Sequence, residues 1–173
     1  MMKSVFKVLL CVCALSVGGA AYAGPFEDGM AAHAANSSGD YLLAFQIWQH
    51  LADQGDSNAQ ANLGRMYREG RGIIQDYAEA AKWTTKSAEQ GYDDAWVDLG
   101  DMYIDGIGVE QDIIAAYMWL NVAAAQSEQG RFAKRYAIEQ RSLVVQRMTP
   151  SQLEKAQELS RKCLAQNYKS CGQ

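Results

Sequence analysis

The chain has 173 residues, of which 49% are hydrophobic and 21% are charged, and its formal net charge at pH 7 is −4. This length allows one domain, and this hydrophobic content is sufficient for a packed core. Nucleic-acid-binding domains carry a surplus of Lys and Arg, so the acidic balance argues against DNA or RNA as a partner. We therefore expect a single folded domain that binds no nucleic acid.

The first 23 residues have the pattern of a cleaved export signal. Lys3 and Lys7 give a positive start, residues 8–17 form an apolar stretch, and Ala21-Tyr22-Ala23 matches an A-x-A cleavage site. The apolar stretch is too short to span a membrane comfortably, and no other membrane segment is expected. We predict that residues 1–23 are removed and that the mature chain is exported, to the periplasm or, alternatively, beyond it.

Residues 24–39 are predicted to form an N-terminal capping helix and a turn. Phe26, Met30 and Ala34 are spaced four apart, which places them on one face of a helix, and residues 36–39 have the composition of a turn. Because the terminal units of repeat proteins need a polar outer face, this helix is expected to cover the hydrophobic edge of the segment that follows.

The central part of the chain contains the same unit twice, displaced by 36 residues. Asp40-Tyr41 aligns with Asp76-Tyr77, and Gly70-x-Gly72 aligns with Gly106-x-Gly108. A third copy begins at Asp112 and then loses the pattern. Self-similarity at a fixed period in this range predicts a solenoid of stacked helix pairs. The predicted units are residues 40–75, residues 76–111 and, in degenerate form, residues 112–148.

Each unit is predicted to consist of two helices joined by a turn. Asp40, Asp76 and Asp112 stand where N-cap residues belong, immediately before a run with helical periodicity. Gly64 and Gly100 recur in the middle of the second helices, where glycine costs about 1 kcal/mol relative to alanine. Their recurrence indicates a close approach of two helices rather than a chemical role.

These spaced residues resemble the Sel-one-like repeat, a longer relative of the tetratricopeptide repeat. The pattern is D-Y-x-x-A, then A-x-Q-G, then A-x-x-x-L-G-x-M-Y-x-x-G-x-G, and it covers Asp40 to about Gln126. The resemblance implies an exported bacterial member of this family with an all-α fold. That fold is a short right-handed α-solenoid of helix–turn–helix repeats, with capping helices at both ends and a concave face that binds partner proteins. The family brings no catalytic residues.

Residues 149–173 are predicted to form a C-terminal capping helix and a disulfide-tied tail. Thr149-Pro150-Ser151-Gln152 is a strong helix start, with threonine as N-cap, proline at the first helical position and glutamine three residues after the cap. An even pair of cysteines at short spacing in an exported protein most often forms a disulfide. We therefore predict a bond between Cys163 and Cys171, because a redox or metal site would need C-x-x-C spacing or histidine partners.

The resemblance also suggests where a protein partner would bind. By analogy with helix-pair solenoids, the first helix of each unit is expected to line the concave face, and its positions outside the core stripe become candidate contacts. These positions are Gln46, Gln49, His50, Lys82, Thr85, Lys86 and Asn121. The set is polar and has little hydrophobic anchor area, so binding is expected to rest on shape and hydrogen bonds along a groove.

Four carboxylates follow one strip of the second helix of the second unit. They are Asp94, Asp98, Asp101 and Asp105, spaced i, i+4, i+7 and i+11. Like charges at this spacing each cost a few tenths of a kcal/mol, and the corresponding strip of the first unit has only one acidic residue. Two interpretations remain open: a surface that meets a cationic partner, or a solvated face whose first acids favour the helix N-terminus.

No catalytic or metal site is predicted. The chain has only two histidines, His33 and His50, without partners at metal-ligand spacing, and it has neither a G-x-S-x-G motif nor a phosphate-binding loop. We expect no enzyme activity and no cofactor. Some disulfide-rich relatives in the resembled family have been discussed as β-lactam-binding or hydrolysing proteins, but they carry cysteine pairs in each repeat, which this chain lacks.

The predicted function is that of a non-catalytic protein–protein interaction scaffold or adaptor in the bacterial cell envelope. One alternative is a periplasmic inhibitor or immunity-type protein that neutralises a toxin or enzyme. A second is binding of peptidoglycan or an anionic envelope surface, because residues 113–173 carry a net charge of +5 whereas residues 24–112 carry −11. The basic residues considered for that contact are Arg131, Lys134, Arg135 and Arg141.

Overall fold

The computed structural model describes residues 25–127, 131–169 and 171, so the predicted export signal lies outside the described residues. Within those ranges the chain forms eight α-helices and no strand. The helices are α2 (Pro25–Ser38), α3 (Tyr41–Asp53), α4 (Ser57–Glu69), α5 (Tyr77–Glu89), α6 (Asp93–Asp105), α7 (Ile113–Gln126), α8 (Arg131–Val145) and α9 (Pro150–Ala165).

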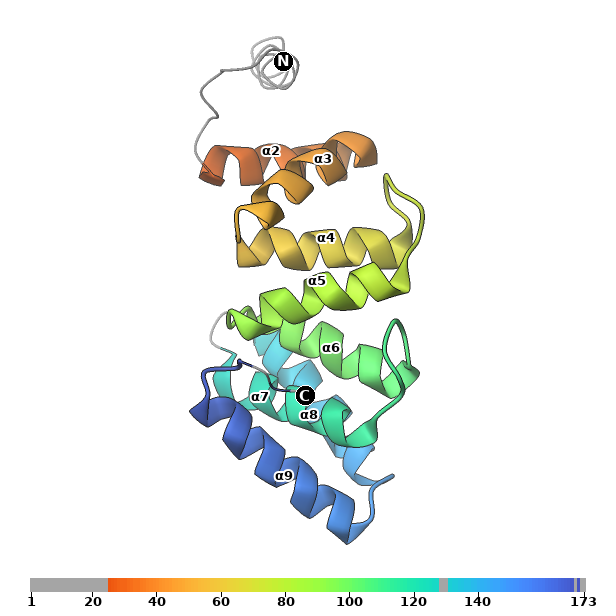
Figure 1. Ribbon diagram of the computed structural model, residues 1–173, viewed down its shortest axis with the longest axis vertical. Helices are drawn as coiled ribbons and strands as arrows, with labels where there is room; N and C mark the ends of the chain where they lie inside the picture. The colour runs from red at the N-terminus through yellow and green to blue at the C-terminus, as the bar shows by residue number, and fades with distance from the viewer. Residues whose placement is uncertain (1–24, 128–130, 170, 172–173) are drawn as a thin grey trace.

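The helices from α2 to α7 are stacked along the long axis of the molecule, and α8 and α9 lie at the C-terminal end (Figure 1). From α2 to α8 each helix packs against the next in sequence. Two hydrophobic cores result, one among α2, α3 and α4 together with Trp83 of α5, and the other from α5 to α9. Tyr67 of α4 packs against both of them. The chain is therefore an all-α helical repeat solenoid.

The first helix of each unit begins at an aspartate, as the repeat pattern predicts. Asp40, Asp76 and Asp112 accept hydrogen bonds from backbone N–H groups of the following turn at 2.8–3.2 Å. The second helices end at Gly70 and Gly106, whose φ angles of 68° and 70° lie in the left-handed region. Glycine adopts this conformation without the steric penalty of a Cβ atom. Each of the first two units therefore begins at an aspartate N-cap, and its second helix ends at a glycine.

The glycines in the middle of the second helices allow two helices to approach closely, which confirms the prediction for them. A Cβ atom at Gly64 would lie 2.5 Å from Oγ1 of Thr84 in α5. A Cβ atom at Gly100 would lie 2.7 Å from Cγ of Leu120 in α7. The tightest helix contacts are therefore those between the second helix of one unit and the first helix of the next.

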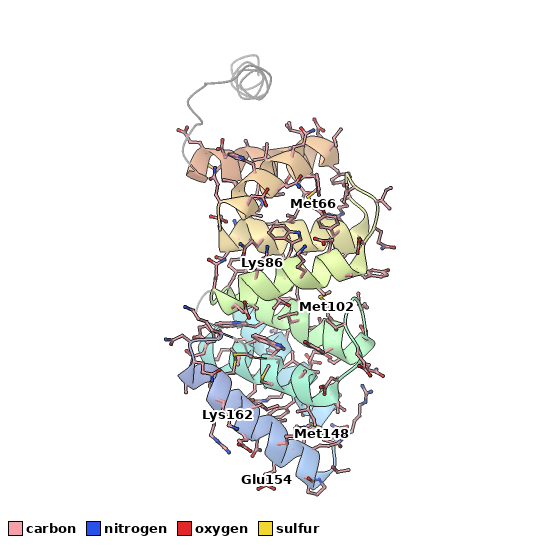
Figure 2. All side chains as sticks on the ribbon, in the orientation of Figure 1. Met66, Lys86, Met102, Met148, Glu154 and Lys162 are labelled. Atoms are coloured by element: carbon pink, nitrogen blue, oxygen red, sulfur yellow. A yellow bond between two sulfur atoms is a disulfide. The ribbon has the colours of Figure 1, made fainter. Side chains whose placement is uncertain are left out.

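Equivalent positions of the two units are filled by the same side chains. Met66 and Met102, labelled in Figure 2, are 4% and 1% exposed, and Leu63 and Leu99 are equally buried. A buried aliphatic side chain stabilises the folded state by about 1.5–3 kcal/mol relative to an exposed one. The repeated residues of the sequence are thus the ones that form the same core contacts in both units.

Helix α7 forms the centre of the C-terminal end. It is apolar on all sides, and nine of its 14 residues are buried, as expected of a helix surrounded by others. The helices that surround it are α6, α8 and α9. The third unit loses the repeat pattern because its later helices enclose α7 instead of extending the stack.

Helix α9 begins with the predicted capping box. The Thr149 hydroxyl accepts a hydrogen bond from the Gln152 N–H, and the Gln152 side chain accepts one from the Thr149 N–H. The helix then packs against α7 and makes almost no contact with α8, although α8 precedes it in the chain. Its outer face is polar, and Figure 2 shows Glu154 and Lys162 on that face.

The predicted disulfide is formed and anchors the C-terminal tail. Cys163 and Cys171 are bonded across a Cα–Cα distance of 5.0 Å. Between them the backbone turns through Asn167 and Tyr168, whose φ angles of 50° and 66° are unusual for residues with a side chain. The turn places the Tyr168 ring on Trp96 of α6, with 4.7 Å between ring centroids. The tail therefore closes on the second unit as well as on α9.

Candidate protein-binding surfaces

The expected contact residues of the first two units lie on α3 and α5. Gln46 and Gln49 are exposed on α3, and Lys82 and Lys86 are exposed on α5, with Thr85 half-buried beside them. These side chains lie outside the core stripes of their helices because the buried positions are taken by alanine and tryptophan. They are polar positions of α3 and α5 that the core does not use.

The two lysines of α5 are held by contacts within their own helix. The Lys82 ammonium donates a hydrogen bond to the Glu79 carboxylate at 2.8 Å, and this contact raises the pKa of the lysine. The Lys86 ammonium lies 3.9 Å from the centroid of the Trp83 ring, a cation–π geometry. Both lysines therefore have defined positions, and a partner would meet an ordered pair of cations.

Tyr67 is a residue of this surface that the sequence analysis missed. It lies on α4, yet its ring contacts Phe45 of α3, with 5.6 Å between centroids. Burial and the nearby Glu79 and Asp76 carboxylates raise its pKa. The same residue type recurs as Tyr103 in the second unit, and Tyr67 itself packs against both hydrophobic cores. We call Gln46, Gln49, Tyr67, Lys82 and Lys86 the α3–α5 surface.

Two further expected contact residues, His50 and Asn121, also have partners within the chain. His50 shares a hydrogen bond with Gln54, with 2.8 Å between the ring Nε2 and the amide Nε2. Asn121 of α7 is half-buried, and its side-chain oxygen accepts a hydrogen bond from Nη1 of Arg141 in α8 at 2.6 Å. Asn121 therefore belongs to the packing of the C-terminal end and lies apart from the α3–α5 surface.

The acidic strip on α6 pairs with arginines of the preceding unit. Nη2 of Arg65 donates to Oδ2 of Asp94 at 3.2 Å, and its Nε donates to Oδ2 of Asp98 at 3.0 Å. Nη1 of Arg68 donates to Oδ1 of Asp98 at 3.3 Å. Because α4 supplies both cations, these ion pairs link the second helices of consecutive units.

The third acid of the strip is bound to the C-terminal end. The Tyr136 hydroxyl of α8 donates a hydrogen bond to Oδ2 of Asp101 at 3.0 Å. Burial raises the pKa of Asp101 to about 6, the hydrogen bond from Tyr136 lowers it, and the neighbouring Asp98 and Asp105 raise it. Burial and the Asp101 carboxylate raise the pKa of Tyr136 to about 12.

Three of the four strip carboxylates therefore have partners in the chain itself. The Asp98 side chain is 16% exposed, whereas that of Asp94 is 46% exposed. A role of the strip toward an external cationic partner stays a prediction. The sequence contained one indication of the pairing with arginine, because the equivalent strip of the first unit has Arg65 where the second unit has Asp101. The strip is part of the contact between units.

The basic residues of α8 divide into two groups. Lys134 and Arg135 are exposed, and the Arg135 guanidinium lies 5.9 Å from the Phe132 ring centroid. Arg141 is half-buried and bonded to Asn121, and the side chain of Arg131 lies outside the described residues. The exposed cations of α8 are thus fewer than the sequence suggested.

Metal ligands and membrane spans were sought in the part of the chain that the structure describes. There, no group of three or more His, Cys, Asp or Glu side chains is placed to hold a metal ion. No helix of that part has the length and apolar character needed to cross a membrane.

The fold and the inter-unit contacts define a helical repeat protein of the kind that serves as an interaction scaffold. The sequence profile of the Sel1 repeat matches residues 57–92 and 97–128. The chain therefore contains two segments with the Sel1 repeat pattern. Each matched segment covers a second helix and the following first helix, which are the pairs joined at Gly64 and Gly100.

Two solved structures are similar to this chain. One is c5321, a protective antigen present in uropathogenic Escherichia coli strains and displaying an SLR fold, with 27% identity and a TM-score of 0.77 over 85% of this chain. The other is a Sel1 repeat protein from Oxalobacter formigenes, with 32% identity and a TM-score of 0.54 over 59% of this chain. The chain spans 31% and 38% of their respective lengths. No curated protein sequence matches the chain.

Proposed function

We propose that the chain is an exported, non-catalytic scaffold that binds a partner protein through the α3–α5 surface. The observation that carries the proposal is that α3 and α5 carry polar side chains that the core does not use, and that Lys82 and Lys86 among them have contacts within α5. Gln46, Gln49, Lys82 and Lys86 supply hydrogen-bond donors and charge, and Tyr67 supplies the aromatic area that hot spots favour.

Export to the cell envelope is supported by two independent features. The disulfide between Cys163 and Cys171 is typical of proteins that fold in an oxidising compartment. The first 23 residues carry the pattern of a cleaved signal. We place the protein in the periplasm of a bacterium, with secretion beyond it as the alternative.

The experiment that tests this function is capture of a partner from envelope extract with the exported chain as bait. The wild type is compared with Lys86→Glu, which reverses a charge on the α3–α5 surface, and with Lys155→Glu, a matched reversal on the exposed face of α9. One protein retained at near-equal stoichiometry by the wild type and Lys155→Glu, and lost with Lys86→Glu, supports the proposal. Equal retention by all three baits contradicts it.

The same experiment separates the scaffold from the periplasmic inhibitor. If the captured protein is a toxin or an enzyme that loses its activity in the complex, the scaffold acts as an inhibitor or immunity-type protein. If the complex retains the partner's activity, the chain acts as an adaptor.

Binding to peptidoglycan or an anionic surface is the second candidate, and the exposed pair Lys134 and Arg135 on α8 favours it. Surface cations attract anionic polymers in a salt-dependent way. Sedimentation with cell-wall sacculi at low and moderate salt tests this function, with a Lys134→Glu, Arg135→Glu variant as comparison. If moderate salt abolishes co-sedimentation and the variant does not sediment, binding through Lys134 and Arg135 is supported. If the variant sediments like the wild type, these two residues are not the binding site.

A further inference from the structure

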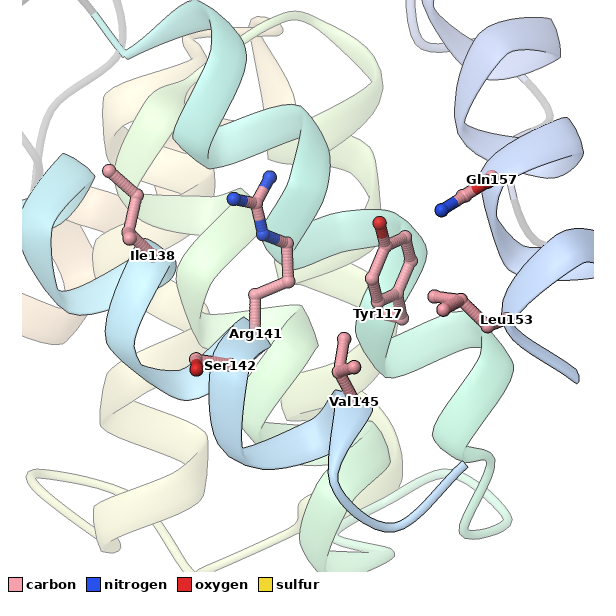
Figure 3. Close-up of a pocket in the computed structure, with 7 residues that line it drawn as sticks. All are labelled: Tyr117, Ile138, Arg141, Ser142, Val145, Leu153 and Gln157. Carbon is pink, nitrogen blue, oxygen red and sulfur yellow. The ribbon is translucent and has the colours of Figure 1, made fainter. Parts of the chain in front are cut away.

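A groove opens where α8 and α9 meet α7. Both helices pack against α7 and make almost no contact with each other. The space between them has a volume of about 470 Å³, within the range of about 300–1,000 Å³ that is common for binding pockets. The groove is lined by Tyr117, Ile138, Arg141, Ser142, Val145, Leu153 and Gln157 (Figure 3).

The repeat architecture explains why this space is open. In the first two units the second helix packs tightly on the next first helix, α4 on α5 and α6 on α7. Helix α8 is the second helix of the third unit, and a continued solenoid would place another helix on it in the same way. The chain instead directs α9 onto α7. Helix α8 therefore packs on α7 and α6, and part of its surface stays exposed.

The groove lining is largely apolar, and some of its side chains remain accessible to solvent. Ile138 is 44% exposed, and Val145 and Leu153 are half-buried. Tyr117 is 7% exposed and contributes its ring from α7. In Figure 3, Ile138, Val145 and Leu153 extend from α8 and α9 on either side of Tyr117. An incoming helix would meet aliphatic side chains on both flanks.

The charge of the lining is positive. Arg141 is its one charged residue, and no carboxylate is among the seven lining residues. One guanidinium N–H group of Arg141 is bonded to Asn121, and a guanidinium has five such donors. Residues 113–173 as a whole carry a net charge of +5, with Glu139, Glu154 and Glu158 adjacent in sequence to lining residues. A carboxylate at this place would gain a charge-assisted hydrogen bond.

We propose that the groove between α8 and α9 binds an amphipathic helix of a partner protein, with apolar residues at i, i+3, i+4 and i+7 and a carboxylate that reaches Arg141. This is the helix-in-groove mode of recognition. The site is separate from the α3–α5 surface, so it holds or fails independently of the function proposed above. The bound helix takes the place that the first helix of a further unit would occupy.

A first helix of this chain supplies a suitable probe. A synthetic peptide of residues 40–54 with blocked ends carries the stripe of Ala44, Trp48 and Leu51 and has two carboxylates. Its binding to the exported full chain is measured by fluorescence anisotropy of a label on the peptide. We expect saturable binding that weakens at least about tenfold in the Ile138→Asp variant. A peptide in which both aspartates are lysine should also bind at least about tenfold more weakly.

Matched controls separate the groove from general effects. Leu143→Asp places the same charge at a residue of α8 that is 50% exposed and outside the groove lining, and it should bind the peptide like the wild type. Circular dichroism establishes that both variants are folded. If Leu143→Asp weakens binding as much as Ile138→Asp does, the groove is not the site and the proposal is overturned.

Other occupants would also overturn the proposal. If dodecanoate binds in an Ile138-dependent way and the peptide does not, the groove holds an anionic amphiphile. If the chain associates with itself in an Ile138-dependent way and does not bind the peptide, the groove is an interface between copies. Absence of any Ile138-dependent binding leaves the groove without a ligand role.

Discussion

Arg65 of α4 donates a hydrogen bond to Asp98 of α6 at 3.0 Å, across 33 positions of the sequence. The Asp98 side chain is 16% exposed and that of Arg65 is 33% exposed, so water screens this pair less than an ordinary surface pair. Arg65 also holds Asp94, and Arg68 reaches Asp98 from the next turn of α4. The contact fixes the rotation of one unit relative to the next.

Removal of Arg65 should destabilise the chain. Arg65→Met leaves Asp94 and Asp98 as neighbouring like charges that are partly buried, and the free energy of unfolding should fall by about 1–2 kcal/mol. Urea denaturation measures this change. In the double variant Arg65→Met, Asp98→Asn, part of the loss should be recovered, because one of the two neighbouring like charges is gone. Two effects that simply add would contradict a direct coupling of the two residues.

The Asp101 carboxylate should make stability depend on pH. Its pKa is about 6 in the folded protein against 3.8 for the unpaired group, so the folded state binds the proton more tightly. Stability from this group is therefore fully present below about pH 4 and is lost as the pH rises through about 6. Asp101→Asn should stabilise the protein at pH 7 by about 1 kcal/mol after solvent screening. Thermal unfolding from pH 4 to 7 measures both the pH dependence of the wild type and the effect of Asp101→Asn. If the variant has the same pH profile as the wild type, the raised pKa of Asp101 is refuted.

Alanine at the mid-helix glycines should destabilise the stack despite its higher helix propensity. A Cβ atom at Gly100 would lie 2.7 Å from Cγ of the fully buried Leu120. The cost of overpacking, typically about 1–3 kcal/mol, outweighs the gain of about 1 kcal/mol in propensity. Gly29→Ala is the control, because a Cβ atom there meets nothing within 4 Å. We expect a lower unfolding midpoint for Gly100→Ala and an equal or higher one for Gly29→Ala.

The disulfide should contribute stability and hold the tail on α6. The bond closes a short loop between residues eight positions apart, so its loss in Cys163→Ala, Cys171→Ala should cost about 2–3 kcal/mol. Tyr168 should then leave Trp96, on which its ring now rests. Thermal unfolding and tryptophan fluorescence measure the two effects. If stability fell without a change in fluorescence, the tail would not depend on the disulfide for its place.

The sequence pattern was informative wherever one residue determines a local conformation. Asp40 and Asp76 marked helix starts, Gly64 and Gly100 marked close helix contacts, and Thr149 marked the start of the last helix. Such signals are local or recur at a fixed period, so they can be read along the chain.

Contacts between distant segments could not be read in this way. The acidic strip was visible as charge, but its pairing with Arg65 depends on how α6 is rotated against α4. The packing of α9 on α7 follows from apolar side chains on all sides of α7, a composition that does not state which helices will cover it. The place of Tyr67 between the two cores, with its ring on Phe45, likewise depends on how α3, α4 and α5 pack together.

Binding of a partner protein on the α3–α5 surface can be tested by amide hydrogen exchange of the exported chain, alone and in complex with the protein it captures. We expect slower exchange in α3 and α5 on complex formation, and no such protection when Lys86→Glu replaces the wild type. Protection confined to α8 and α9, with α3 and α5 unchanged, would contradict it.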